Sequence, residues 1–172
     1  MVRYYNELTR LEMEQVDKDE TVVMIPVGAL EQHGNQAPLG TDDIIAEAMT
    51  DYIRRELEGG PSSEDSDFPM LVFPVIPIGL STEHRNFCGS ITLKPDTYYH
   101  MLYDISTSLV HHGSKKLAFL VCHGGNAPIV QVLSRELRSE FGISPFILSS
   151  GAFSHPDVTA TISEGNIWDF HG

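Results

Sequence analysis

A glycine-rich turn at residues 27–43, VGALEQHGNQAPLGTDD, brings carboxylates and an imidazole together in a way that could hold a metal ion. Glu31 and His33 are two residues apart, so in an extended segment their side chains leave the same face. A carboxylate oxygen and an imidazole nitrogen can then bind one divalent ion. Asp42 can bring a second carboxylate back to the same place. The turn therefore predicts part of a metal site, which needs a partner from elsewhere in the chain.

A second polar turn, CHGGN at residues 122–126, supplies that partner. It follows the apolar run KKLAFLVC at 115–122, just as the first turn follows TVVMIPVG at 21–28. Both runs are typical of buried parallel strands, and ligands bind beyond the carboxyl ends of such strands. His123 is therefore expected next to the first turn, and Gly124, which has no side chain, lets backbone and substrate approach closely. The sequence predicts one metal site shared by the two turns.

Helix-like segments alternate with these strands along the chain. Helical spacing of apolar residues predicts helices from Thr41 to before Gly59, over 96–110, and from Asn126, as the capping residue, to Phe141. Two further strand-like runs lie at 70–79 and 143–150, and the prolines in the first of them predict an edge or irregular position. The alternation predicts an α/β fold with a mostly parallel sheet covered by helices on both faces.

Length and composition limit the classes of function. A chain of 172 residues with 41% hydrophobic content predicts a single domain over 1–172. Its formal net charge of −13, with no cluster of Lys and Arg, argues against a nucleic-acid partner. No run approaches the roughly 20 apolar residues that span a bilayer, and the start of the chain is mixed polar. We therefore expect a cytoplasmic protein with no membrane partner.

Four stretches of the sequence resemble the signatures of the creatininase (creatinine amidohydrolase) family. They are PVGALEQHGNQAPLGTDDIIAEAM at 26–49, GLSTEHRNFCGSITL at 79–93, CHGGN at 122–126 and WDFHG at 168–172. The resemblance implies a three-layer α/β/α sandwich with a centre of one or two divalent ions, zinc first and manganese or iron as alternatives. The family normally continues beyond the equivalent of Gly172, so the single creatininase-like domain is expected to lack the C-terminal portion of the family.

The resemblance also assigns metal ligands. These are Glu31, His33, Asp42 and His123, with Asp42 bridging two ions and Glu31 counted among the catalytic residues as well. Asp43 is interpreted instead as an acid in a first helical turn, where it opposes the helix macrodipole. Gly125 stands where creatininase has a glutamate, which leaves a second ion short of a ligand and argues against strict creatinine hydrolysis.

Further roles follow from the other two signatures. His171 is implied as the catalytic histidine that protonates the leaving nitrogen. Substrate-binding positions are implied for Ser81, Gly124, Trp168 and Asp169. Glu83 and His84 lie beside Ser81 in the segment where the family builds a pocket wall or a subunit contact, and a purely structural role is an open alternative.

These roles imply a metal-dependent amidohydrolase in which an activated water cleaves a C–N bond of a small cyclic amide or formamide. Two alternatives stay open: a metallopeptidase-like enzyme that trims a small peptide, and a truncated, catalytically idle protein that binds a metal or another ligand. The expected partners are a small-molecule amide and further copies of the chain, since the family resemblance implies a homo-oligomer, often a hexamer.

Overall fold

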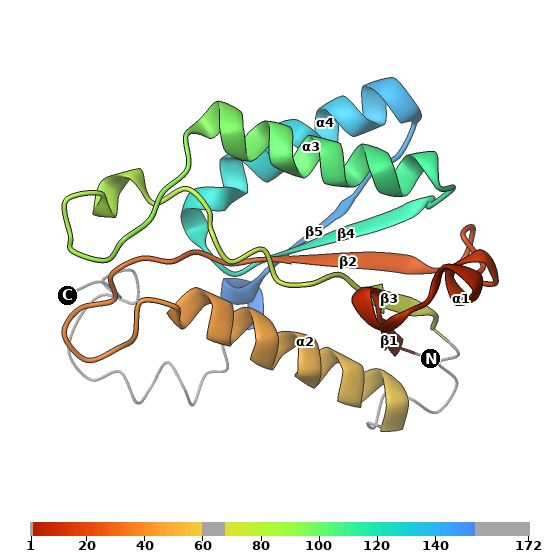
Figure 1. The fold of residues 1–172 in the computed structure, drawn as a ribbon, viewed down its shortest axis with the longest axis horizontal. Helices are drawn as coiled ribbons and strands as arrows, with labels where there is room; N and C mark the ends of the chain where they lie inside the picture. Colours follow the sequence, from red (N-terminus) through yellow and green to blue (C-terminus); the bar gives the residue numbers. More distant parts are fainter. Residues whose placement is uncertain (1, 60–67, 154–172) are drawn as a thin grey trace.

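A computed structural model describes residues 2–59 and 68–153 and shows a parallel sheet between two helical layers (Figure 1). The sheet has five strands in the order β1-β3-β2-β4-β5, and every neighbouring pair is parallel. The strands are β1 (Val2–Tyr4), β2 (Val22–Val27), β3 (Met70–Val72), β4 (Lys116–Val121) and β5 (Phe146–Ser149). The expected α/β sandwich is confirmed.

The helices lie on both faces of this sheet. They are α1 (Arg10–Glu14), α2 (Thr41–Gly59), α3 (Pro95–His111) and α4 (Ala127–Phe141), with short 3₁₀ turns η1 (Tyr5–Glu7), η2 (Thr82–His84), η3 (Gly124–Asn126) and η4 (Ser150–Phe153). Helices α3 and α4 cover one face, and α2 covers the other (Figure 1). Within the described ranges, no helix is both long and apolar enough to cross a bilayer.

The central strands are apolar throughout because both of their faces are buried. Alternate residues point to opposite faces, so Ile25 and Phe119 pack in the core under α3 and α4, whereas Met24 and Leu120 pack in a smaller core that includes Ala46 of α2. All five side chains are at most 1% exposed. Such two-sided burial holds β2 and β4 rigidly in register.

Strands β2 and β4 pair along their full length, from Val22 opposite Lys116 to Val27 opposite Val121. Pairing continues one step further through the bond from the Cys122 amide to the Val27 carbonyl, at 3.0 Å. The two polar turns therefore leave the sheet side by side at the same edge. The loops that follow two neighbouring parallel strands thus lie close together, as the sequence predicted.

The strand-like run at 70–79 was expected at an edge or in an irregular position, and the edge placement is wrong. Only Met70–Val72 forms a strand, and it lies inside the sheet between β1 and β2. Beyond Val72 the run is irregular, as the other expected alternative has it, and it pairs with β2 again only at Ile76, between the two prolines Pro74 and Pro77. Strand β1, which the sequence pattern did not reveal, takes the edge position instead.

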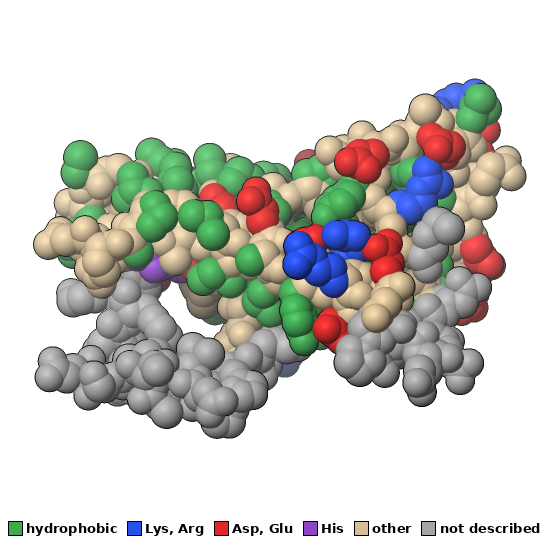
Figure 2. Space-filling model, turned by 90° about the horizontal axis from the view of Figure 1, so that it is seen from below, with side chains coloured by type: hydrophobic (Ala, Val, Ile, Leu, Met, Phe, Trp, Pro, Cys, Tyr) green, Lys and Arg blue, Asp and Glu red, His purple; other side chains and the backbone are tan. Residues whose placement is uncertain are grey.

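Helix α2 exposes a charged surface toward its C-terminal end. Arg54 contacts Asp51 at 2.8 Å and Glu58 at 2.7 Å, and Arg55 also pairs with Asp51 at 2.5 Å. Figure 2, which views the molecule from the side of α2, shows acidic and basic side chains grouped next to one another on this face. These are pairs between helical neighbours three or four residues apart, in contact with solvent.

Candidate metal centre

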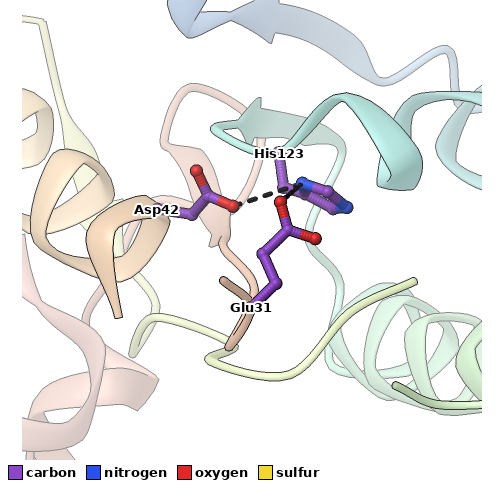
Figure 3. A group of neighbouring side chains, drawn as sticks. All are labelled: Glu31, Asp42 and His123. Carbon is purple, nitrogen blue, oxygen red and sulfur yellow. Dashed lines mark ion pairs between the residues drawn. The ribbon is translucent and has the colours of Figure 1, made fainter. Parts of the chain in front are cut away.

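Three buried side chains from three separate elements converge beyond the carboxyl ends of β2 and β4 (Figure 3). Glu31 lies in the loop after β2, and Asp42 lies in the first turn of α2. His123 is the second residue after the end of β4. His123 Nδ1 lies 3.2 Å from Glu31 Oε1 and 3.2 Å from Asp42 Oδ2. One ligand atom from each residue falls within 4.8 Å of the others. The structure thus brings together three of the four expected ligands around one point.

Local backbone contacts explain why the loop delivers these groups. The Glu31 amide donates to the Leu39 carbonyl at 2.9 Å, which folds the loop back on itself. The Thr41 hydroxyl donates to the Pro38 carbonyl at 2.6 Å just where α2 begins. Asp42 therefore occupies the first helical turn, with its carboxylate close to Glu31.

A backbone carbonyl fixes the orientation of the His123 ring. His123 Nε2 lies 2.6 Å from the Leu80 carbonyl oxygen, which can only accept a hydrogen bond. The ring therefore donates from Nε2 and turns Nδ1 toward Glu31 and Asp42. Histidine ligands of metals are commonly held in this way, with the second ring nitrogen donating to a carbonyl or carboxylate.

The electrostatic environment of Glu31, Asp42 and His123 favours a positive charge between the two carboxylates. Burial would raise the pKa of Glu31, but hydrogen bonds from His123 and Ser81 outweigh it and lower that pKa. Burial also disfavours the charged form of His123, yet its bonds to Asp42 and Glu31 raise the pKa to about 10. Two buried carboxylates so close together are stabilised by a positive charge between them, which either the protonated His123 ring or a bound cation can supply.

The donor set fits a divalent metal ion. Two carboxylate oxygens and an imidazole nitrogen suit zinc, manganese or iron, and three protein ligands with one open position are typical of catalytic zinc sites. Glu31, Asp42 and His123 are 0%, 5% and 5% exposed, so an ion held by them would be largely shielded from solvent.

His33, the fourth expected ligand, lies on the other side of Asp42. Its Nε2 is 3.3 Å from Asp42 Oδ1, while His123 approaches Oδ2, so the carboxylate lies between two imidazoles. His33 Nδ1 is held 3.2 Å from the Glu31 carbonyl. In the part of the chain that the structure describes, no group of three ligand residues includes His33. The arrangement permits a bridging role for Asp42 but provides fewer ligands on the His33 side.

Gly125 explains part of this asymmetry. A Cβ atom at this position would lie 2.2 Å from the Leu80 carbonyl oxygen and 2.5 Å from His123 Nε2. The backbone therefore passes too close to its neighbours for any side chain, including the glutamate that the family resemblance associates with this position.

Asp43 does not join the cluster, although it lies in the first turn of α2 as expected. It is half-buried, and burial raises its pKa to about 6, with further contributions from the nearby carboxylates of Asp42 and Glu47. Burial and like charges thus outweigh any favourable effect of the helix macrodipole on Asp43.

Asn126 was expected to cap α4; it does occupy the N-cap position, but its side chain does not cap the helix. Its side chain makes no capping bond; instead, Oδ1 accepts from the Leu80 amide at 3.0 Å and Nδ2 donates to the Gly28 carbonyl at 2.8 Å. Asn126 is fully buried, and a Cβ at Gly79 would lie 2.2 Å from its Oδ1. The asparagine fastens the loops around Gly28 and Leu80 to the end of β4. Its place in CHGGN was the only signal that sequence reasoning could have used.

The remaining predicted site residues differ in how far the structure places them. Ser81 is fully buried, and its hydroxyl contributes to the lowered pKa of the Glu31 carboxyl. Gly124 lies in η3 with open space where a side chain would be. Trp168, Asp169 and His171 lie outside the described residues.

Comparison with known proteins places these features in a family. Residues 6–172 match the sequence model of the creatininase family, described as creatinine amidohydrolase. The mycofactocin precursor peptide peptidase of Mycobacterium ulcerans is 31% identical over 118 residues, covering 69% of this chain and 46% of that protein. The creatinine amidohydrolase of Pseudomonas putida is 27% identical over 145 residues, covering 78% of this chain and 52% of that protein. The chain thus spans about half the length of the curated relatives that it matches.

Solved structures agree with the fold. A mutant creatininase described as Zn-Zn type is 26% identical, with a TM-score of 0.70 over 95% of this chain and 65% of that chain. A creatininase described with Mn is 25% identical, with a TM-score of 0.69 over the same shares. The chain therefore shares the overall fold of these creatininases over most of its length.

Proposed function

The chain belongs to the creatininase family, and from that premise we propose that it is a metal-dependent hydrolase that cleaves a C–N bond of an amide substrate. The observation that carries the proposal is the convergence of Glu31, Asp42 and His123 at the carboxyl ends of two adjacent strands. The four-signature resemblance noted in the sequence agrees with the match to the family.

In this proposal some residues of the chain bind the ion, and another residue transfers a proton to the leaving group. A bound divalent ion would supply an acidic water and polarise the substrate carbonyl. Glu31 and Asp42 balance the charge of the ion, and the Leu80 carbonyl keeps His123 Nδ1 facing it. We assign the protonation of the leaving nitrogen to His171, because an imidazole can give up a proton near neutral pH. Ser81, Gly124, Trp168 and Asp169 are proposed to bind the substrate.

For the substrate we propose first a small cyclic amide or a formamide. The match to the family model and the relationship to the Pseudomonas putida enzyme support this class. The glycine at position 125 argues against creatinine itself, since a side chain there is sterically excluded.

A short peptide is the second candidate. It is supported by the relatives at 30 to 31% identity, which are mycofactocin precursor peptide peptidases. Both candidates require hydrolysis of an amide C–N bond at the same metal centre, so they differ only in the shape of the substrate.

A panel of lactams, formamides and short peptides tests the proposal. The chain loaded with zinc or manganese is expected to release free amine from one class, and Asp42→Asn is expected to lose that activity. Turnover that persists unchanged in Asp42→Asn would contradict the assignment of the centre. Stoichiometric metal binding without turnover of any compound would favour the alternative of a catalytically idle metal-binding protein. The cytoplasmic location stays a prediction, as does the homo-oligomeric assembly, for which the family resemblance implies a hexamer.

A further inference from the structure

Glu31 has a second histidine neighbour besides His123. His84, at the end of η2, places its Nε2 3.9 Å from Glu31 Oε1, the same oxygen that His123 approaches at 3.2 Å, so the contact with His84 is electrostatic rather than a direct hydrogen bond. Glu83 stands next to it, and single ligand atoms of Glu31, Glu83 and His84 fall within 4.8 Å of one another. The group can be interpreted as a second cation site or as a support that positions Glu31. The two differ in whether His84 Nε2 carries a hydrogen.

Gln32, the residue between the two expected ligands Glu31 and His33, decides between these interpretations. The Gly34 amide donates to Gln32 Oε1 at 2.9 Å, and a backbone amide can only donate. The oxygen of the Gln32 amide is thereby identified, so its nitrogen faces His84 Nδ1, at 2.9 Å.

An amide nitrogen donates, so His84 Nδ1 accepts the bond and the hydrogen of a neutral ring lies on Nε2. This hydrogen faces Glu31. The metal-binding interpretation needs a free electron pair at Nε2, which this hydrogen-bond direction removes.

The turn that holds Gln32 is built for this contact. Gly34 has a φ of +69°, in the left-handed region that favours glycine, and a Cβ there would lie 2.6 Å from Gln32 Oε1. The side chain of Gln32 thus folds tightly over its own turn, where it reaches both the Gly34 amide and His84.

We infer that His84 is a positioning residue: oriented by Gln32, it presents its Nε2 hydrogen to Glu31 and holds that carboxylate in place for the metal ion. The inference rests on the proposed function, because it takes Glu31 as a ligand. It also assigns a role to Gln32 and to the histidine of the Glu-His pair in the third signature. His84 is not itself a ligand, and Glu83, which is exposed, is not part of a second cation site. Outer groups that orient metal ligands typically change metal affinity by about 10- to 100-fold when they are replaced.

Nitrogen-15 NMR of the His84 ring tests the direction of the hydrogen bond between Gln32 and His84 without any substitution. In the metal-free 172-residue chain, the chemical shifts are expected to show hydrogen on Nε2 and none on Nδ1. The same pattern is expected after zinc is added. Hydrogen on Nδ1 in the metal-free chain, or zinc coordination at Nε2, would overturn the inference.

Zinc affinity in substituted chains tests the consequence. Competition with a chromophoric chelator is expected to show about 10- to 100-fold weaker binding in His84→Ala. His84→Gln keeps an amide donor, and its zinc affinity is expected to be higher than that of His84→Ala. Gln32→Met removes the hydrogen bond that orients the His84 ring, and its zinc affinity is expected to lie between those of wild type and His84→Ala. His100→Gln, at an exposed histidine of α3, is the matched control with unchanged affinity.

The possible results separate this inference from the proposed function. Wild-type affinity in His84→Ala overturns the inference alone, since the ligands would not need the support of His84. Loss of one bound zinc per chain in His84→Ala, out of two, also overturns it and identifies a second cation site. If the wild-type chain binds no zinc, manganese or iron, both the proposed function and this inference are wrong. Circular dichroism of each variant excludes a folding defect as the cause of weaker binding.

Discussion

The two halves of helix α2 carry the same chemical group in opposite environments. Asp42, in the first turn, is 5% exposed and lies between two histidines at 3.2 and 3.3 Å. Asp51, toward the other end, meets Arg54 and Arg55 at the surface, and the hydrogen bond with Arg54 is the main cause of its lowered pKa. One helix therefore presents both a carboxylate shielded for metal binding and a carboxylate balanced by flexible side chains in solvent.

The comparison teaches that the burial of a carboxylate, rather than its presence on a helix, makes it useful as a ligand. Exposed ion pairs contribute little to the stability of the fold, because water screens the two charges and because forming the pair restricts two long side chains. Buried carboxylates depend on their partners, because an unpaired charge away from water is costly. Changes at the buried end of α2 should therefore have large effects on metal binding, and changes at the exposed end should have almost none.

A near-complete loss of metal is expected from His123→Ala, as from Asp42→Asn. The substitution removes the only imidazole that contacts both carboxylates, Glu31 and Asp42, among the ion pairs of the described residues. We expect loss of most bound zinc or manganese, beyond the about 10- to 100-fold typical of outer groups. Elemental analysis of the purified chain measures this loss. The fold should persist, since the residue follows the end of a strand, and unchanged metal content would contradict the assignment.

Asp42→Asn and Asp43→Asn form a matched pair at the same end of α2. The first replaces a carboxylate that contacts His33 and His123, so we expect metal binding to be abolished. The second replaces a carboxylate whose charged form is already disfavoured, because burial and neighbouring acids raise its pKa to about 6. Its metal affinity should stay close to that of wild type in isothermal titration calorimetry. Similar losses in both variants would show that Asp42 has no special role.

Helix α1 provides a solvent-exposed acid in a first turn, for comparison with Asp42. The Glu12 carboxylate accepts from the Thr9 hydroxyl and amide and from Arg3, which lower its pKa from 4.5 to about 2. A folded-state pKa below the unfolded value means that the stabilisation is present above pH 4.5 and is lost as the pH falls toward 2.

In Glu12→Gln this acid-dependent part of the stability should be reduced, with a small effect because the group is exposed. Thermal unfolding of both chains across that pH range measures the difference. Metal affinity at neutral pH should not change, and a change would show that α1 is coupled to the centre.

The smallest effect is expected from Asp51→Asn, on the partly exposed side of the C-terminal half of α2. Arg54 keeps its contact with Glu58 at 2.7 Å, so one ion pair survives the substitution. We expect metal binding equal to that of wild type and nearly unchanged thermal stability, measured by differential scanning calorimetry. A marked loss of metal would show that the two ends of α2 are not independent.

The sequence predicted those parts of the fold that have a local pattern. Apolar runs in the sequence predicted β2 and β4, and apolar residues at helical spacing predicted α2, α3 and α4. Two polar turns after adjacent strands then led to Glu31, Asp42 and His123, because topology places such turns together.

The features that the sequence did not predict depend on contacts between distant loops. Nothing near Asn126 indicates that its side chain bonds to the backbone at Gly28 and Leu80 rather than capping α4. The contact between Gln32 and His84 joins residues 52 positions apart and has no periodic signal. Strand β1 has only three residues, too few to show an alternating pattern.

Gly125 limits how the proposed metal centre could change over evolution. A glycine codon can become a glutamate codon through one nucleotide change, yet the backbone at this position leaves no space beside the Leu80 carbonyl and His123. A new ligand would be accepted only after the loop containing Leu80 had moved, and that loop is fastened by Asn126. The order of substitutions would therefore matter: the loop must change first, and a glutamate introduced earlier would disrupt the ligand histidine that it was meant to assist.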